Sequence, residues 1–248
     1  MTDRPPAFGG RLLAVRILAA VMAVSAIGFG LFTAIFGIVN PAQEPHAFHN
    51  AVVASLLIVL SAPPVIAIAR SPERAIRPLV ILAVVGVAAL ATMAVALTPD
   101  PFTLPFVVLV GVLWALVPAR SGAFPDGRPS VPLLALAVVA LLAAAPYALE
   151  QAGLQRSDHA SEHAAFFHWV EMAFYATAIP LLALLAALRP RAYRAAAWAS
   201  AVALAILGAA SLAFPTYASA VPAPWSWAAL AGTIPFLIVV EIEVRRAR

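Results

Sequence analysis

The chain has 248 residues, of which 64% are hydrophobic and 10% charged, and its mean hydropathy is +0.98. A soluble domain carries about 25% charged residues, so this composition excludes a soluble globular protein and indicates a multi-pass membrane protein. The net charge is +4, but the basic residues are all arginines in short segments between apolar runs, which excludes nucleic acid as a partner. Because there is no cysteine, disulfides, thiolate metal sites and cysteine nucleophiles are also excluded.

Eight apolar runs follow one another along the chain, and each is predicted to form a transmembrane helix. A bilayer core of about 30 Å needs roughly 20 helical residues at ~1.5 Å per residue. The first run, 17–39, has 23 residues. It exceeds the ~7–15 residues of a signal-peptide core, so we expect an uncleaved span. The later predicted spans are 49–69, 78–97, 102–117, 131–149, a histidine-bearing stretch continuing to 188, 195–213 and 225–240.

Two of these runs carry local packing signals. Small residues in the first span, including Gly28, Gly30 and Gly37, are typical of helices that approach a neighbour closely. Pro63 and Pro64 lie two-thirds of the way along the second span, where they are expected to kink the helix. Both features predict a packed helical bundle within the bilayer.

The arginines predict the orientation of the bundle. Fourteen of the fifteen fall on one side of the eight-span topology: Arg4, Arg11, Arg16, Arg70, Arg74, Arg77, Arg120, Arg128, Arg189, Arg191, Arg194, Arg245, Arg246 and Arg248. Only Arg156 falls on the other side. The positive-inside rule then places both termini in the cytoplasm, in a protein of the inner (plasma) membrane. The histidine-bearing segments face the extracytoplasmic side.

An internal repeat is also predicted. His49 precedes Arg70 by 21 residues, and His168 precedes Arg189 by the same 21. Each half has four spans in the same in–out order, so we expect two parallel four-helix repeats related by a pseudo-twofold axis along the membrane normal. The predicted organisation is a first repeat at 1–120, a cytoplasmic linker at 121–130 and a second repeat at 131–248.

The five histidines occupy two short segments. His46 and His49 lie in EPHAFHN at the start of the second span, and His159, His163 and His168 lie in DHASEHAAFFHW at the start of the sixth. Imidazole suits Fe, Cu and Zn, whereas Mg and Ca prefer oxygen ligands. The pseudo-twofold would bring the two segments to comparable positions, and together they form the candidate cofactor or metal site.

Helical spacing limits which of these side chains meet. His168, Glu171 and Tyr175 are spaced to line one stripe that descends ~10 Å into the sixth span. Glu171 is predicted to orient the imidazole, to bind the ion or to accept a proton. His163 and His168 are five apart, so they converge only if the helix starts or breaks near residues 161–165. The predicted metal ligands are His46, His49, His163, His168 and Glu171, with His49 and His168 as the cofactor-binding pair.

Simpler interpretations apply to several of these residues. His46 and His159 are also consistent with hydrated residues at helix ends, and a continuous helix would turn His159 away from His168. Tyr175 and Trp169 are also consistent with ordinary packing at a membrane interface. Three further acidic residues of this side are expected to be solvated loop charges: Asp100, Glu150 and Asp158.

Three functions fit these observations. In the first, the site binds haem or a transition metal (Cu, Fe or Zn) and has a redox or metal-handling role. In the second, the histidine–glutamate stripe is the relay of a proton- or cation-coupled transporter, because ionisable groups inside spans are costly and usually functional. In the third, the protein is a non-catalytic membrane assembly subunit. The expected partners are the lipid bilayer and either other membrane proteins or further copies of the chain.

The tandem architecture, with His49 and His168 at the outer ends of the second helix of each half, resembles the haem A synthases and related membrane b-type cytochromes. The resemblance covers all eight spans and implies haem binding by these two histidines. In that family the fourth helix of each half also supplies a histidine. Spans 102–117 and 225–240 have none, so the resemblance implies at most one site, shared between the halves.

Overall fold

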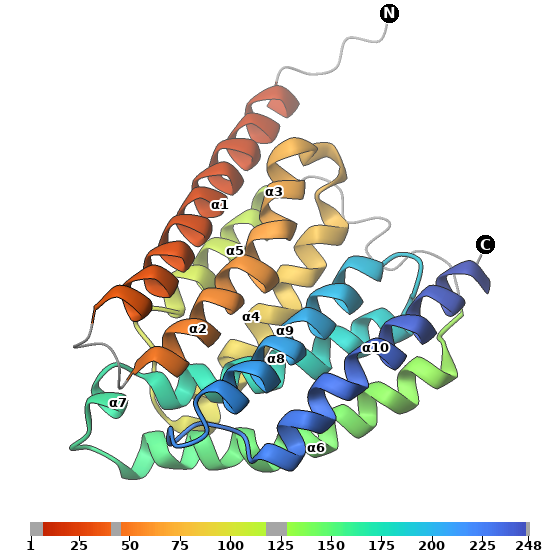
Figure 1. Cartoon of the computed structure of the whole chain (residues 1–248). Coiled ribbons are helices and arrows are strands. Elements are labelled where there is room, and N and C mark those ends of the chain that lie inside the picture. Colours follow the sequence, from red (N-terminus) through yellow and green to blue (C-terminus); the bar gives the residue numbers. More distant parts are fainter. Residues whose placement is uncertain (1–6, 41–45, 118–127, 247–248) are drawn as a thin grey trace, which may run out of the picture.

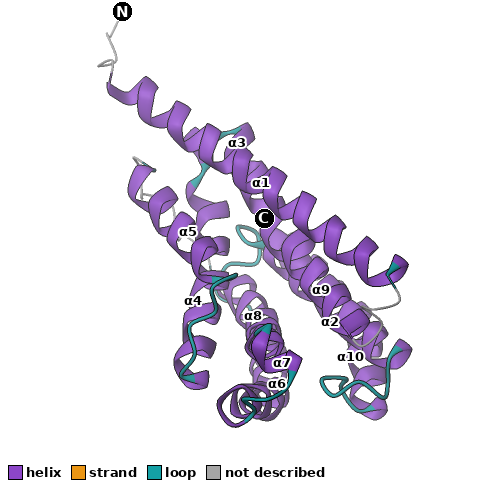
Figure 2. Cartoon of the chain, turned by 90° about the vertical axis from the view of Figure 1, so that its left-hand side faces the viewer, coloured by secondary structure: helices purple, strands orange, loops and turns teal. Residues whose placement is uncertain are grey.

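The computed structural model describes residues 7–40, 46–117 and 128–246, and these ranges contain helices and no strand (Figures 1 and 2). In chain order the elements are α1 (Ala7–Val39), α2 (Ala47–Ser55), the π-helical segment η2 (Leu56–Ser61), α3 (Ala62–Arg70), the 3-10 turn η3 (Pro72–Arg74), α4 (Ile76–Ala96), α5 (Leu104–Leu116), α6 (Val131–Ser157), α7 (Glu162–Ala165), α8 (His168–Leu188), α9 (Arg194–Ala213) and α10 (Ala223–Arg246). The predicted all-α class is confirmed, whereas most of the predicted 121–130 linker lies outside the described residues.

Within the described residues, seven helices are long and apolar enough to cross a membrane, with α2, η2 and α3 together forming one span from Ala47 to Arg70. The fourth predicted span corresponds to α5, which has 13 residues. Such a helix rises only about 20 Å, less than the ~30 Å of a bilayer core. The chain therefore has the architecture of a multi-pass membrane protein, and the count of eight spans stays a prediction.

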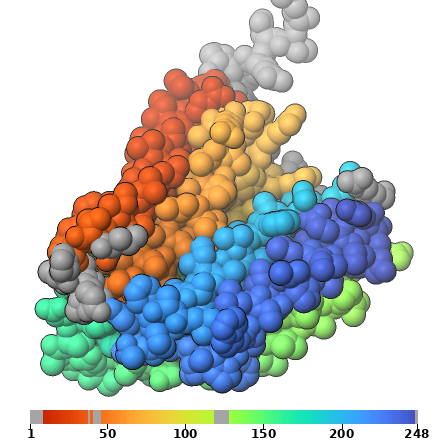
Figure 3. Space-filling model, viewed as in Figure 1, coloured from red at the N-terminus to blue at the C-terminus, as the bar shows by residue number. Residues whose placement is uncertain are grey.

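The bundle is built around α8. This helix packs against α6, α4, α9 and α2, and most of its residues are buried. The outer helices α1, α6 and α10 instead expose large apolar side chains such as Val24, Leu142 and Ile234. Figure 3 shows α1 (red to orange) and α10 (dark blue) on the outside of the molecule. In water such a surface would be unfavourable, but a lipid bilayer solvates it. The core and the exposed apolar surface thus agree with a membrane environment.

The two ends of the bundle differ in chemistry. The start of α1, the turn after α3 and the end of α10 lie toward the upper side of Figure 1, and they carry the described arginine clusters. The start of α2 and the short helix α7 lie at the lower left of the same view. These last two elements carry the histidines, so the arginine clusters and the histidines occupy opposite ends of the bundle.

Two of the predicted small residues explain how closely α1 approaches its neighbour. A Cβ added at Gly30 would lie 2.8 Å from the Ile58 side chain, and one at Gly37 would lie 2.9 Å from Asn50. A Cβ at Gly28 would meet open space. Gly30 and Gly37 therefore permit the contact of α1 with α2 and η2, whereas Gly28 plays no part in it.

The π-helical segment η2 accompanies the proline pair of the second span. Pro63 and Pro64 have no N–H group, and each ring crowds the carbonyl four residues earlier, inside η2. A locally wider turn relieves this crowding, and such π segments are frequent near functional sites. Within this segment the Ser61 hydroxyl donates to the carbonyl of Leu56, 3.2 Å away.

Two sequence expectations at this end of the bundle were wrong. The fifth span was expected to end at residue 149, but α6 continues to Ser157, so Glu150 is helical. Asp100 was expected to be solvated, but it is 1% exposed, and its carboxylate accepts a hydrogen bond from the Phe102 N–H at 2.8 Å. In the first case the helix continues beyond the apolar run, and in the second a local backbone hydrogen bond allows the carboxylate to be buried, where hydropathy alone indicates a solvated loop.

Candidate metal centre

Two histidines come from the beginning of the second span. His46 is the N-cap residue of α2 and His49 is the third residue of the helix. Residues three apart lie on the same helix face, so both rings project to one side of α2. Both are buried, with 5% and 1% of their surface exposed. Burial inside a protein favours the neutral imidazole, which is the form that binds metals.

The other two histidines lie on either side of a helix break. The Ser161 side chain accepts a hydrogen bond from the Ala164 N–H and caps the one-turn helix α7, which carries His163. The chain then turns through Phe167, whose φ of 62° lies in the left-handed region, and α8 begins at His168. This conformation costs a bulky residue about 1–2 kcal/mol. The break near residues 161–165 that the sequence required for convergence is present.

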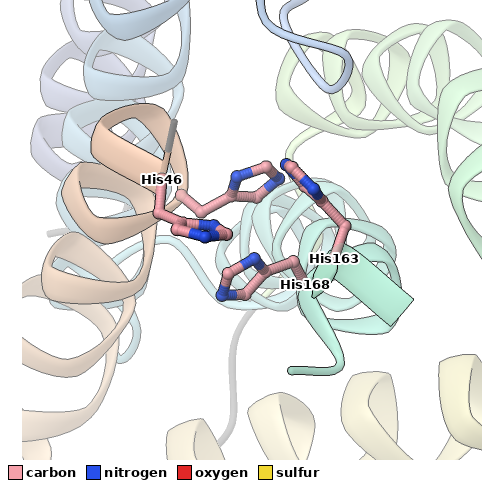
Figure 4. A group of neighbouring side chains, drawn as sticks. His46, His163 and His168 are labelled. Carbon is pink, nitrogen blue, oxygen red and sulfur yellow. The ribbon is translucent and has the colours of Figure 1, made fainter. Parts of the chain in front are cut away.

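The four histidines meet in one cluster (Figure 4). One ring nitrogen from each of them lies within 4.8 Å of the others. The rings of His49 and His168 are stacked, with centroids 4.6 Å apart and planes 14° apart. The remaining measured pairs of ring centroids are 4.8 to 5.6 Å apart, for His49–His163, His46–His168, His46–His163 and His163–His168. We call this group the four-histidine cluster.

Three of the rings present a nitrogen that has no protein partner. The Nδ1 atoms of His46, His49 and His168 are buried and make no hydrogen bond. A buried polar atom without a partner costs about 1–3 kcal/mol, so such atoms are rare in native structures and require an explanation. Three of them in one cluster are explained if Nδ1 of each ring binds a ligand held between the rings.

A hydrogen-bond chain fixes the tautomer of His49. The Ser219 hydroxyl donates to the Gln151 Oε1 atom at 2.9 Å, so its oxygen accepts from the His49 Nε2 atom, 3.0 Å away. His49 therefore carries its proton on Nε2 and keeps the lone pair of Nδ1 free. Metal-binding histidines in proteins usually donate their second N–H to such a partner. Tyr147 holds this arrangement in place by donating to the Ser219 carbonyl at 2.6 Å.

Sequence reasoning did not find Ser219, Gln151 or Tyr147. Ser219 lies in the loop between α9 and α10, 170 residues from His49, and Gln151 lies on α6. Serine and glutamine are common residues with no diagnostic spacing here. The one available signal was the polar Gln151 near the end of an apolar run, which is consistent with a loop as well as with a buried partner.

His46 and His163 have different partners. The His46 Nε2 atom lies 3.3 Å from a carboxylate oxygen of Glu162, and its Nδ1 atom is buried without a hydrogen-bond partner. The His163 ring is half-buried and stacks on Trp169, with centroids 5.0 Å apart. Burial, followed by the nearby charge of His46, lowers the pKa of His163. His163 is therefore neutral at pH 7 and available as a ligand.

Asp158 fastens the segment that carries His163. Its carboxylate accepts hydrogen bonds from the Ser161 hydroxyl and N–H groups and from Trp169 Nε1, the last at 3.3 Å. These bonds, led by that of the Ser161 hydroxyl, lower the pKa of Asp158 to about 2. Its ionised carboxylate holds α7 and the indole of Trp169 beside His163.

The remaining predicted site residues lie apart from the cluster. Glu171 is not among the four clustered residues, and its electrostatic interaction is with Asp100. Tyr175 is buried and its hydroxyl lies 2.5 Å from the Ser55 hydroxyl and 2.9 Å from the Ala203 carbonyl. It thus ties α8 to α2 and α9 below the cluster. His159 is exposed and is not among the four clustered histidines.

The four imidazole groups determine which class of metal ion the site could bind. Four imidazole groups suit Zn, Cu, Fe or Ni, whereas Mg and Ca prefer oxygen ligands. Zn–N bonds of ~2.0–2.1 Å place the nitrogens of a tetrahedral site about 3.3 Å apart. The separations of up to 4.8 Å are wider, and small side-chain rotations toward a common centre would close the difference. The cluster could therefore hold one transition-metal ion.

Comparison of the chain with protein-family models, with curated protein sequences and with solved structures finds no match.

Proposed function

We propose that the protein binds one transition-metal ion in the four-histidine cluster, at the extracytoplasmic end of a multi-pass helical bundle. The observation that carries the proposal is the convergence of four imidazoles, three of which present a buried Nδ1 atom with no other partner. An ion at the centre would satisfy all three atoms at once. Cu, Zn and Fe are the ions that such a neutral nitrogen set suits.

A single ion fits the cluster better than haem does. A haem iron with two histidine ligands needs imidazoles on opposite faces of the porphyrin, with their nitrogens directed at each other. The His49 and His168 rings are stacked instead, so their in-plane lone pairs run side by side. The ring centroid of His46 lies 5.0 Å from that of His168, and the ring centroid of His163 lies 4.8 Å from that of His49. The space that a porphyrin would need beside these rings is thus occupied by two further ligands.

The position of the cluster supports a redox or metal-handling role on the extracytoplasmic side. It lies at the end opposite the described arginine clusters, which the positive-inside rule assigns to the cytoplasm. A relay through the membrane would need further ionisable groups along α8. Between Met172 and Leu188 this helix has no carboxylate, histidine or basic residue. This favours a site that holds an ion over a transport path, the second candidate role.

The packing pattern also supports the proposed tandem repeat. In the first half α1 packs on α2 and α3, α3 on α4, and α4 on α5. In the second half α6 packs on α8, α8 on α9, and α9 on α10. Between the halves, α4 packs on α8, as α9 packs on α2 and η2. A pseudo-twofold axis relating the halves would pass near the contact of α2 with α8, beside the cluster.

Metal analysis of the purified protein tests the proposal. The full chain would be purified in detergent, loaded with Cu2+ or Zn2+, freed of excess ion and analysed for metal content together with its absorption spectrum. We expect about one ion per chain and no Soret band. Retention of no ion would refute the proposal, and a haem spectrum would restore the cytochrome interpretation.

A further inference from the structure

The end of the bundle opposite the four-histidine cluster carries a large excess of positive charge. Its described part has eleven arginines but only three carboxylates, those of Glu73, Glu241 and Glu243. Two of these carboxylates form ion pairs, Arg194–Glu241 at 2.7 Å and Arg246–Glu243 at 2.8 Å. Most of the positive charge at this end is therefore not neutralised by carboxylates of the described residues.

Two of the arginines lie near one buried hydroxyl group. Arg189 directly follows α8, and its carbonyl accepts a hydrogen bond from the N–H of Tyr193, the residue before α9, at 3.0 Å. Arg77 is the second residue of α4, which packs against α8. The Tyr193 side chain is fully buried, and burial raises the pKa of its hydroxyl, whereas the charges of Arg77 and Arg189 oppose this shift. The ends of α4, α8 and α9 thus bring two guanidinium groups together.

The start of α6 adds a third arginine and an apolar surface to this junction. The Ser130 N–H donates to the Ala187 carbonyl, near the end of α8, at 2.8 Å. Arg128 lies two residues before Ser130 and is exposed. The apolar side chains of Val131 and Leu188, at the ends of two membrane-spanning helices, are 74% and 37% exposed. Cationic and exposed apolar side chains are therefore neighbours at the level where a membrane-spanning helix meets water.

This combination matches the chemistry of an anionic phospholipid. Guanidinium groups bind phosphate oxygens through paired N–H donors, and basic pockets between membrane-spanning helices bind anionic headgroups. Inorganic phosphate would contact only the arginines, whereas the acyl chains of a phospholipid would also cover Val131 and Leu188. We propose that Arg77, Arg128 and Arg189 bind the headgroup phosphate of an anionic phospholipid at the junction of α4, α6 and α8. This lipid site is separate from the metal site and does not depend on it.

Native mass spectrometry of the full chain in detergent tests the lipid site. Phosphatidylglycerol and phosphatidylcholine would be titrated separately, and we expect the wild type to bind the anionic lipid more tightly. Arg77→Gln/Arg189→Gln should weaken phosphatidylglycerol binding about 25-fold, because each arginine near a membrane surface contributes a factor of about five. The matched control Arg74→Gln/Arg191→Gln removes two exposed arginines from the same end and should leave the affinity nearly unchanged.

Three results would overturn the proposal. Equal losses in the two double variants would show that the arginines act only through their total charge. Equal wild-type affinity for the two lipids would exclude a site for an anionic headgroup. Displacement of phosphatidylglycerol by excess inorganic phosphate at constant ionic strength would assign the arginines to a soluble anion. If Arg77→Gln/Arg189→Gln is not monodisperse, the single variants Arg77→Gln and Arg189→Gln provide the test, each with an expected loss of about fivefold; wild-type affinity in both would also overturn the proposal.

Discussion

The two histidine-bearing segments reach the same site by different means. His46 and His49 lie at the start of one helix and are both buried, and the Nε2 atom of His49 is held by the buried Ser219 hydroxyl. His163 and His168 are separated by a strained turn at Phe167 and are half-buried. The first segment is therefore a preorganised half of the site. The second is an adjustable half, since α7 is one turn long and is held by side-chain bonds.

The largest expected effect comes from removing the ligands. His46→Ala, His49→Ala and His168→Ala should each lose most of the bound metal, because each removes an imidazole whose Nδ1 atom is buried and has no other partner. The double variant His49→Ala/His168→Ala should be little worse than either single variant, since residues that act as one unit are not additive. Equilibrium titration with Zn2+ or Cu2+ measures this.

His163→Ala sharpens the comparison between the halves. This variant removes one ligand from the adjustable segment and leaves the other three histidines. We therefore expect weaker but measurable metal binding rather than complete loss. His159→Ala is the matched control and should keep the wild-type affinity. Full metal content in both His49→Ala and His168→Ala would show that the cluster does not act as one site.

A smaller effect is expected from the partner that fixes His49. Ser219→Ala removes the acceptor of the Nε2 proton, and loss of such a partner typically weakens metal binding about 10–100-fold. Ser226→Ala is the matched control, because that buried serine donates to the Val221 carbonyl at 2.8 Å and has no link to the cluster. Glu162→Gln should have less effect than Ser219→Ala, since the Glu162 side chain is 78% exposed. Equal affinities for both serine variants would contradict this assignment.

The pH dependence of binding tests the adjustable half. Metal binding requires deprotonated imidazoles, so affinity should fall as the pH decreases from about 7 to 5. Burial and the charge of His46 lower the pKa of His163, so protons compete for this residue only below its usual range. The slope of log Kd against pH should become shallower in His163→Ala at the acid end. An unchanged slope would show that His163 does not bind the ion.

The smallest effect is expected at the arginine end. Replacing Arg70, Arg74 and Arg77 with lysine keeps the positive charge that sets orientation and removes only the planar guanidinium groups. Membrane insertion and metal content should both be unchanged, as judged by a cytoplasmic reporter fused after Arg248 and by metal analysis. A selective loss of metal in this variant would show that the functional site lies at the arginine end of the bundle and not at the histidine end.

The helical framework could be predicted from the sequence because apolar runs of about 20 residues have few alternatives. Helix ends were less predictable: α6 passes its apolar run by eight residues, to Ser157. In the fourth run the helix is instead shorter than the predicted span 102–117, because α5 contains only 13 residues. Hydropathy marks the apolar runs, but it does not locate these helix ends.

The candidate site was predictable in part. Matching positions in the two halves pointed to His49 and His168, which lie together in the structure. The five-residue spacing of His163 and His168 was consistent with a continuous helix, which separates them, or with a helix break, which lets them converge. The structure has the break, at the strained turn of Phe167, and no sequence pattern predicts that turn. Helical periodicity placed Glu171 one turn below His168 on the same stripe, and its role at the site stays a prediction, since its electrostatic interaction is with Asp100. Ser219 and Gln151 depend on tertiary contacts that no local pattern encodes.

The measurement that tests the central claim most directly is X-ray absorption spectroscopy of the metal-loaded protein. Loaded with one Zn2+ per chain, the wild type should show a first shell of four imidazole nitrogens at about 2.0–2.1 Å. Multiple scattering from the rings should identify them as histidine, and His163→Ala should replace one of them with an oxygen ligand from water. A first shell dominated by oxygen, or one with fewer than three imidazoles in the wild type, would contradict the four-histidine site.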